Sequence, residues 1–299
     1  MDTPANDESL PLPDAAEAAA VEDAPAPVPL RRIVVALDAS AHSHAALEVA
    51  VMLALRLRAE IQAVFVEDIN LLRLTELPFA REVRFGQAGA HPVQSDDVQR
   101  GLRARAAVLR RAVEDVAEQS KVSSTFRVVR GAVVGEVLAA ALEADLLALG
   151  RLGHAVARRG RLGSTAQAAV ARAASAVLLV HPAMENGPVL LLFDGSAAAA
   201  RALELAAEVI GDSNDLRVLV WGPEETLASD RRQLAEELLK VSVARVQYQQ
   251  LDGGDAQRIL SWVNKQHGSL LIMPAGGDWP EAVVETLLEE ADPQLLFIR

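Results

Sequence analysis

The sequence predicts an α/β protein with two domains in tandem, each built on a doubly wound, five-stranded parallel sheet. Three observations predict this architecture. Short, continuous apolar runs alternate with longer amphipathic stretches from residue 30 onward, which is typical of parallel strands whose two faces are covered by helices. The alternation occurs twice in the same order, which indicates an internal duplication. The length of 299 residues also suits two domains of ordinary size.

The predicted elements divide evenly between the two halves. In the first half, strands are predicted at 31–37, 61–66, 125–130, 145–150 and 175–180, and helices at 41–59, 97–120, 133–143 and 164–174. In the second half, strands are predicted at 188–193, 216–221, 244–249, 269–274 and 294–299, and helices at 197–210, 225–241, 255–266 and 279–290. We therefore expect residues 30–182 to form the first domain and residues 188–299 the second.

Two segments lie outside this repeat. Residues 1–29 are rich in Ala, Pro, Asp and Glu and contain no aromatic residue. We expect them to form a disordered acidic tail, because such a composition buries too little apolar surface to offset the entropy of ordering. Residues 67–97 are inserted after the second strand of the first half only. Their LLRLTEL core predicts a short amphipathic helix that either packs over the sheet or contacts a partner protein.

Composition excludes several functional classes. Cysteine is absent, so there is no disulfide framework, thiolate metal site or cysteine nucleophile. The net charge is −12, and seven of these negative charges come from residues 1–29, which leaves −5 for the rest of the chain. An acidic body disfavours nucleic-acid binding. We find neither an apolar run of the roughly 18 residues that a membrane span needs nor a secretory signal pattern, so we expect a cytoplasmic protein.

The strongest functional signal follows the fourth strand of the first half. Gly150, Gly153 and Gly163 are separated by two and nine residues, and Ser164 and Thr165 then open a helix. Glycine allows backbone amides to approach phosphate oxygens, and a helix N-terminus adds unpaired amides and a favourable dipole. Three arginines in the nine-residue loop can neutralise a polyphosphate, namely Arg158, Arg159 and Arg161. The segment therefore predicts a phosphate-binding loop.

This segment resembles the G-x2-G-x9-G-S/T signature of nucleotide-binding members of the universal stress protein family, and residues 150–164 match it at every fixed position. The stretch VVALDASAHSHAAL at 34–47 is similar to the family's first strand, acidic residue and helix start. The resemblance extends over 30–182 and, in outline, over 188–299, as in tandem members. It implies a Rossmann-like, adenine nucleotide alpha hydrolase-like fold and a pseudo-dimer whose fifth strands lie against each other. A further homodimer of whole chains stays open.

The resemblance also implies a ligand and its contacts. ATP would bind with Mg²⁺, and the cation would be held mainly through the phosphates. Asp38 and Val66 would lie beside the adenine and ribose, with Gly131 near the base. The ribose and phosphates would be wrapped by Leu149, Gly150, Gly153, Gly163, Ser164 and Thr165. The roles of the three loop arginines rest on charge and position alone.

The second half keeps only part of this pattern. Asp194–Ser196 repeats the first-strand signature, but residues 273–287 lack both the nine-residue loop and the Gly-Ser/Thr helix start. Asp278 and Glu281 would place negative charge where phosphate would lie, which repels it. We therefore predict that the second domain binds no nucleotide.

No catalytic grouping or metal-ligand cluster stands out in the sequence. Asp38 is the one acid near the predicted nucleotide, but it lacks the orienting partner that a general base needs. We expect an ATP-binding regulatory module of the stress response, with an unidentified protein partner, rather than an enzyme. Two alternatives remain open: a slow ATPase that uses Asp38 and the arginine loop, and a stress-response scaffold that binds no nucleotide. The motif also leaves open whether the ligand is ATP, AMP or another nucleotide.

Overall fold

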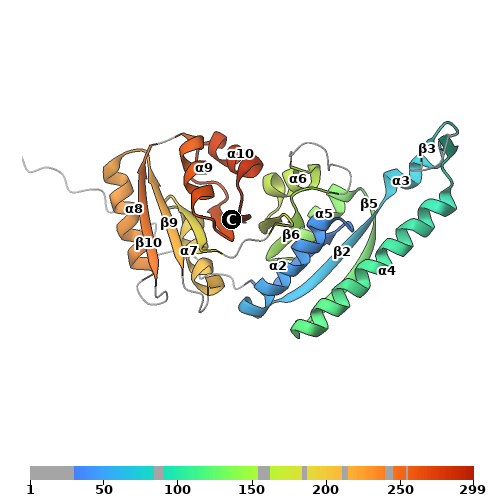
Figure 1. Ribbon diagram of the computed structural model, residues 1–299, viewed down its shortest axis with the longest axis horizontal. Helices are drawn as coiled ribbons and strands as arrows, with labels where there is room; N and C mark the ends of the chain where they lie inside the picture. Colours follow the sequence, from blue (N-terminus) through green and yellow to red (C-terminus); the bar gives the residue numbers. More distant parts are fainter. Residues whose placement is uncertain are drawn as a thin grey trace, which may run out of the picture.

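The computed structural model describes residues 30–83, 90–153, 162–183, 187–210, 215–239, 245–253 and 255–299. The predicted acidic tail, residues 1–29, lies outside these residues. Figure 1 shows the two halves of the chain side by side, with one twisted sheet running through both. No helix in the described part of the chain is long and apolar enough to cross a membrane.

Ten strands form the main sheet. The first half contributes β1 (Arg32–Leu37), β2 (Glu60–Asp68), β5 (Ser124–Gly131), β6 (Leu146–Gly150) and β7 (Ala176–Val180), and the second contributes β8 (Val189–Phe193), β9 (Leu216–Gly222), β10 (Val246–Asp252), β11 (Leu270–Pro274) and β12 (Gln294–Ile298). The sheet order is β5-β2-β1-β6-β7 in one half and β10-β9-β8-β11-β12 in the other. Both halves therefore share one strand order, and every pairing within a half is parallel. The predicted fold class is confirmed.

Helices cover both faces of the sheet. One face carries α2 (Ala41–Leu57), α4 (Ser95–Ser120), α7 (Ala197–Ile210) and α8 (Glu225–Leu238), and the other carries α5 (Val133–Ala141), α6 (Ser164–Arg172), α9 (Ala256–Lys265) and α10 (Glu281–Glu290). Each face has its own hydrophobic cluster. The central strands are buried on both faces, which explains why their sequences are continuously apolar rather than alternating.

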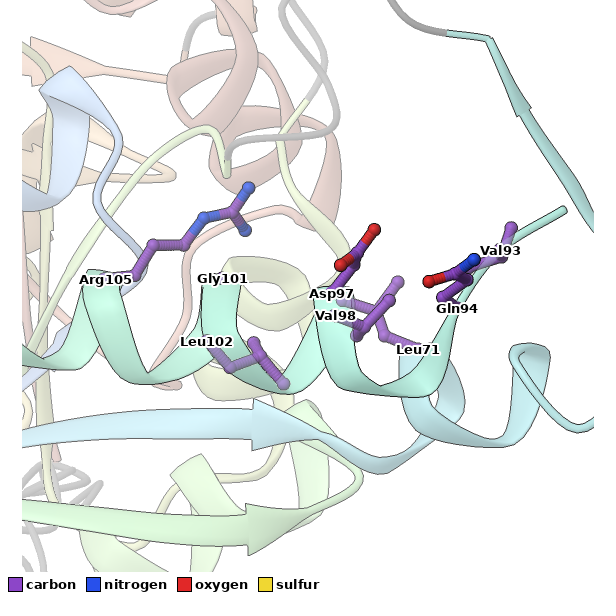
Figure 2. Close-up of a pocket in the computed structure, with 8 residues that line it drawn as sticks. All are labelled: Leu71, Val93, Gln94, Asp97, Val98, Gly101, Leu102 and Arg105. Atoms are coloured by element: carbon purple, nitrogen blue, oxygen red, sulfur yellow. The ribbon is translucent and has the colours of Figure 1, made fainter. Parts of the chain in front are cut away.

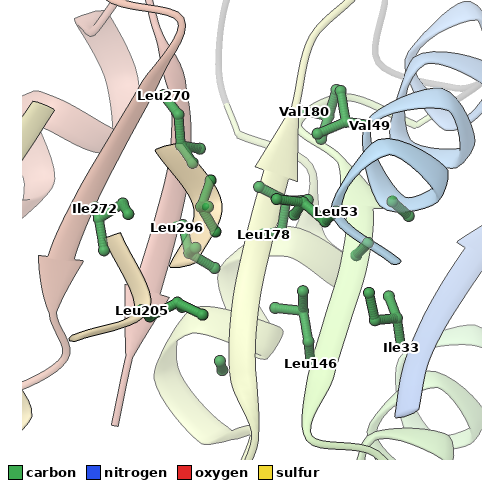
Figure 3. Packing of buried hydrophobic residues seen from close by; sticks show 14 of the residues in the cluster. Ile33, Val49, Leu53, Leu146, Leu178, Val180, Leu205, Leu270, Ile272 and Leu296 are labelled. Atoms are coloured by element: carbon green, nitrogen blue, oxygen red, sulfur yellow. The ribbon is translucent and has the colours of Figure 1, made fainter. Parts of the chain in front are cut away.

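The two halves meet along the antiparallel pair β7–β12. Leu178 lies opposite Leu296 in this pair, and both side chains are fully buried. Figure 3 shows that the apolar cluster around them continues from one half into the other. The guanidinium of Arg56 on α2 donates to the carbonyls of Val209 and Ile210 at the end of α7, and cations are favourable there because of the helix dipole. The expected contact between the two fifth strands is confirmed.

The insertion in the first half extends away from the sheet. Strand β2 continues to Asp68, and the chain then forms α3 (Ile69–Leu74) and a small antiparallel pair, β3 (Arg81–Val83) and β4 (Ala90–Pro92). Figure 1 shows α3 and β3 at the end of the molecule farthest from the second half. The predicted short helix is confirmed, but packing over the sheet is wrong for most of the described residues of the insertion. Among them Leu72 packs against the core cluster, whereas Phe79 is 76% exposed.

Candidate nucleotide-binding site

The candidate site lies where the carboxyl ends of three neighbouring strands meet. Strand β1 lies between β2 and β6, with Leu37 opposite Phe65 and Ala36 opposite Leu149. Asp38 follows β1 directly, so Val66 and Leu149 flank the strand end from which Asp38 projects. The order of the strands reverses at β1, and such a switch point is where open parallel sheets bind ligands.

A short turn fixes Asp38 at the start of α2. Asp38 Oδ1 accepts a hydrogen bond of 3.0 Å from the Ser40 amide, and Ser40 Oγ accepts one of 3.1 Å from the Ser43 amide, which caps the helix. The second half repeats this turn. Asp194 Oδ1 accepts from the Ser196 amide at 3.0 Å, and Ser196 Oγ accepts from the Ala199 amide at 3.1 Å. The internal duplication therefore extends to individual hydrogen bonds.

The backbone of this turn predicts opposite effects on protein stability for substitutions at Ala39 and at the equivalent Gly195. Ala39 has φ 63°, whereas the equivalent Gly195 has φ 78°, and only glycine adopts this left-handed region without a steric cost. Ala39→Gly is expected to raise the free energy of unfolding by about 0.5–1 kcal/mol, and Gly195→Ala to lower it by about 1–2 kcal/mol. Urea unfolding of both variants measures this. A destabilised Ala39→Gly protein would contradict the assigned backbone strain.

The glycine-rich segment folds back toward Asp38. A Cβ on Gly150 would lie 2.6 Å from His42 Cβ, so the absence of a side chain lets this segment pack against the first turn of α2. A Cβ on Gly153 would lie 3.2 Å from Asp38 Oδ2. The Gly163 amide donates to the Arg151 carbonyl at 2.8 Å, which joins the two ends of the loop. The structure therefore brings Asp38 and all three predicted glycines together.

Helix α6 begins at this loop with its amides directed toward the site. Gly163 is its N-cap, and no side chain of the described residues caps the helix. Its first turn contains no acidic residue, and Ser164 is exposed while Thr165 is half-buried. The first amides of a helix have no partner within the helix, so this end can accept an anion. The donors and the small residues fit a phosphate group.

The remaining residues predicted to bind the nucleotide differ in how close they lie to Asp38 and in which of their atoms could reach a ligand. The side chains of Val66 and Leu149 are buried in an apolar cluster, so they offer mainly backbone to a ligand. Gly131 ends β5, two strands from β1, where it pairs with Asp68, and a Cβ on it would lie 2.2 Å from Glu136 Oε1. It therefore borders the site but does not touch Asp38. The three loop arginines, Arg158, Arg159 and Arg161, lie outside the described residues.

The sequence reasoning missed an ion pair at the edge of the site. Arg130 Nη2 lies 2.7 Å from Glu67 Oε2, and Arg130 Nε lies 2.9 Å from the same atom. Glu67 is buried, and the pair joins the ends of β2 and β5 between Val66 and Gly131. The sequence does contain a signal for this pair, because an acid lies near the end of β2 and a base near the end of β5. It could be recognised only once the two strands were known to be neighbours. The pair also balances the negative charge of Glu67 next to the site.

In the second half, the backbone closes over the equivalent acid. Asp194 is buried, and the Asp278 amide donates to its Oδ2 at 3.2 Å. A Cβ on Gly277 would lie 2.1 Å from the same oxygen. The loop after β11 therefore contacts Asp194 at the place where the first half has Gly153 near Asp38.

Aromatic side chains fill the adjoining space in the second half. Trp221 and Trp279 are both buried, with ring centroids 5.2 Å apart, as expected for core residues. Arg231 lies over Trp221 and forms an ion pair with Asp278. This pair changes one step of the sequence argument: Arg231 balances the charge of Asp278, so Asp278 repels a phosphate less than its sequence position alone indicates.

Comparisons with known proteins agree with this architecture. The model of the universal stress protein family matches residues 29–181. A universal stress protein structure from Archaeoglobus fulgidus is 17% identical, covers 89% of this chain and 95% of its own, and has a TM-score of 0.67. A putative universal stress protein from Pseudomonas aeruginosa is 14% identical, covers 90% and 92%, and has a TM-score of 0.59. A search of functionally curated proteins gave no significant match. Because the family model matches more than half of its length, the chain belongs to the universal stress protein family.

Proposed function

We propose that the first half of the chain binds ATP with Mg²⁺ and acts as a regulatory module, while the second half binds no nucleotide. One observation carries this proposal. Asp38, Gly153 and Gly163 meet beside the N-terminus of α6, which no side chain of the described residues caps, whereas residues of the chain itself fill the equivalent place in the second half.

The ligand would lie across the carboxyl ends of the strands. The phosphates would contact the backbone at Gly153 and Gly163 and the hydroxyls of Ser164 and Thr165. The base and ribose would lie toward β2 and β5, beside the backbone of Val66. Mg²⁺ would supply charge neutralisation while held mainly by the phosphates, because this cation retains waters and needs few protein ligands.

The contacts of Asp38 favour binding over catalysis. Its Oδ1 accepts the Ser40 amide hydrogen bond, which holds the carboxylate beside Gly153, where the ribose and phosphates of the ligand would lie. As a contact of the ligand, Asp38 would bind the nucleotide without activating water, so we expect bound ATP to persist. Sustained release of phosphate that disappears in Asp38→Ala would instead support the ATPase alternative.

Arg151 provides a route from the nucleotide to the second half. It lies between Gly150 and Gly153, and its guanidinium donates to the carbonyls of Ala291, at 2.7 Å, and Leu288 at the end of α10. Burial lowers the pKa of Arg151, but the usual value is high enough that it stays charged at neutral pH. A loop rearranged by ATP would therefore change a contact with the second half.

Titration calorimetry tests the binding step. ATP with Mg²⁺ is added to the wild-type protein, to Ser164→Ala and to Ser196→Ala, which removes the hydroxyl that caps α7 beside Asp194 in the second half. We expect about 3–10-fold weaker binding in Ser164→Ala, as for the loss of one solvent-exposed hydrogen bond that contributes about 1 kcal/mol, and unchanged affinity in Ser196→Ala. Parallel titrations with AMP and cyclic nucleotides identify the preferred ligand. No heat with any of them at millimolar concentration would favour the scaffold alternative.

A further inference from the structure

A second concave site lies in the insertion, away from the candidate nucleotide site. A pocket of about 270 Å³ lies between α3 and the start of α4. Figure 2 shows its lining side chains around the first turns of α4. The apolar part of its lining consists of Leu71, Val93, Val98 and Leu102. Two charged residues, Asp97 and Arg105, border it. Such a pocket suits short apolar side chains that are flanked by charge.

The exposed face of α4 beyond this pocket is strongly basic. Between Val98 and Val113 the helix contains five arginines and no acidic residue. All five are exposed: Arg100, Arg103, Arg105, Arg110 and Arg111. Arg105 borders the pocket, and the helical repeat places the other four together on the adjoining exposed side of α4. We call the five residues the arginine face. Arg100 pairs with Asp97 and Arg110 stacks over Phe126, whereas Arg103, Arg105 and Arg111 form no ion pair with any described residue. On a chain of net charge −12, this face is an exception.

We propose that the pocket and the arginine face bind the chain's own acidic segment 1–29. The sequence DESLPLPD at 7–14 places Leu10 and Leu12 between acidic residues, which matches an apolar pocket bordered by arginine. The whole segment contains seven acidic residues and no Lys or Arg. In the proposed complex, Leu10 and Leu12 occupy the pocket and the remaining acids lie along the arginine face.

The attachment point of the segment makes this contact possible within one chain. Leu30 packs against the same apolar cluster as the buried residues of α4, so the segment leaves the core on the face that α4 covers. Helix α4 has 26 residues and is about 39 Å long. The residues between Asp14 and Leu30 can span about 50 Å when extended, which exceeds the length of the helix.

Tethering favours this occupant over a separate acidic protein. A flexible attachment gives the segment an effective concentration in the millimolar range, so even a weak contact is largely formed. The contact would also cover the basic face of an otherwise acidic protein and prevent it from binding other polyanions. Because it depends on charge, high salt should release it.

The absence of cysteine allows a direct test in the full chain. Ser9→Cys is combined with Ala104→Cys on the exposed side of α4, or with Thr226→Cys on α8 as the control, and each pair is labelled for energy transfer. For the Ala104 pair, we expect transfer to fall at least about twofold between ~50 and ~500 mM NaCl. The triple variant Arg103→Gln, Arg105→Gln, Arg111→Gln should lose transfer at low salt, while thermal melts report that it remains folded.

Three results would overturn the proposal. The first is transfer that does not change with salt, and the second is an equal salt response in the Thr226 pair. The third is a signal that disappears when labelled protein is diluted with unlabelled protein, because it would assign the contact to a second copy of the chain. Loss of the salt response in the double variant Leu10→Ser, Leu12→Ser would support occupation of the pocket by the two leucines. An unchanged response would leave the charge contact in place and overturn the assignment of these leucines to the pocket.

Discussion

Gly153→Val is expected to abolish nucleotide binding, weakening it at least about 100-fold, or about 2.7 kcal/mol. The first carbon of the new side chain would already lie 3.2 Å from Asp38 Oδ2, and the branched remainder would occupy the space proposed for the phosphates. The backbone amides of the loop would then be held away from the ligand. Titration with ATP and Mg²⁺ measures the loss.

Gly101→Val serves as the matched control for this variant. Gly101 is exposed on α4, and a Cβ there would meet nothing within 4 Å. Its affinity for ATP should equal that of the wild type, and its stability should change by less than about 1 kcal/mol, because the site has room for the side chain and valine has a higher helix propensity than glycine. Wild-type affinity in folded Gly153→Val would exclude the phosphate-loop assignment.

Leu296→Ala is expected to lower the free energy of unfolding by about 2–5 kcal/mol. Leu296 is fully buried in β12 opposite Leu178 of β7, at the junction of the two halves. Truncation removes apolar contacts on both sides of the junction and leaves a cavity in a densely packed region. Urea unfolding measures the change, and we expect both halves to unfold in one transition because they share one sheet.

Leu142→Ala provides the corresponding surface control. Leu142 follows α5 and is 75% exposed, so its truncation should change stability by less than about 0.5 kcal/mol. If both leucine variants lost similar amounts of stability, or if the halves unfolded separately, the β7–β12 junction would contribute less than its burial indicates.

The inner strands were predictable from local sequence because the fold buries both of their faces. Runs such as 176–180 and 189–193 are apolar at every position, and the structure places them in the middle of the sheet. The orientation of the insertion was not predictable in this way. Its leucines fit a helix that covers the sheet as well as one that extends from it, and only the tertiary structure distinguishes the two.

The parts of the candidate site that depend on the spacing of residues along the chain were predictable. The parts that depend on contacts between distant residues were less predictable. The glycine spacing led to the loop beside Asp38, and the repeated acidic turn led to Asp194. In contrast, the Glu67–Arg130 pair and the Trp221–Trp279 packing join residues far apart in the sequence. Such contacts follow from which strands and loops become neighbours, and a single sequence does not encode them locally.

The central claim is that one nucleotide binds per chain, in the first half. Freshly purified protein is denatured, and the released nucleotide is identified and counted against the protein concentration. We expect about one ATP per chain after saturation with ATP and Mg²⁺, by the one-site argument, and almost none from Gly153→Val. Two per chain would show that the second half also binds. None from the wild-type protein, even after incubation with ATP and Mg²⁺, would contradict the proposed function itself.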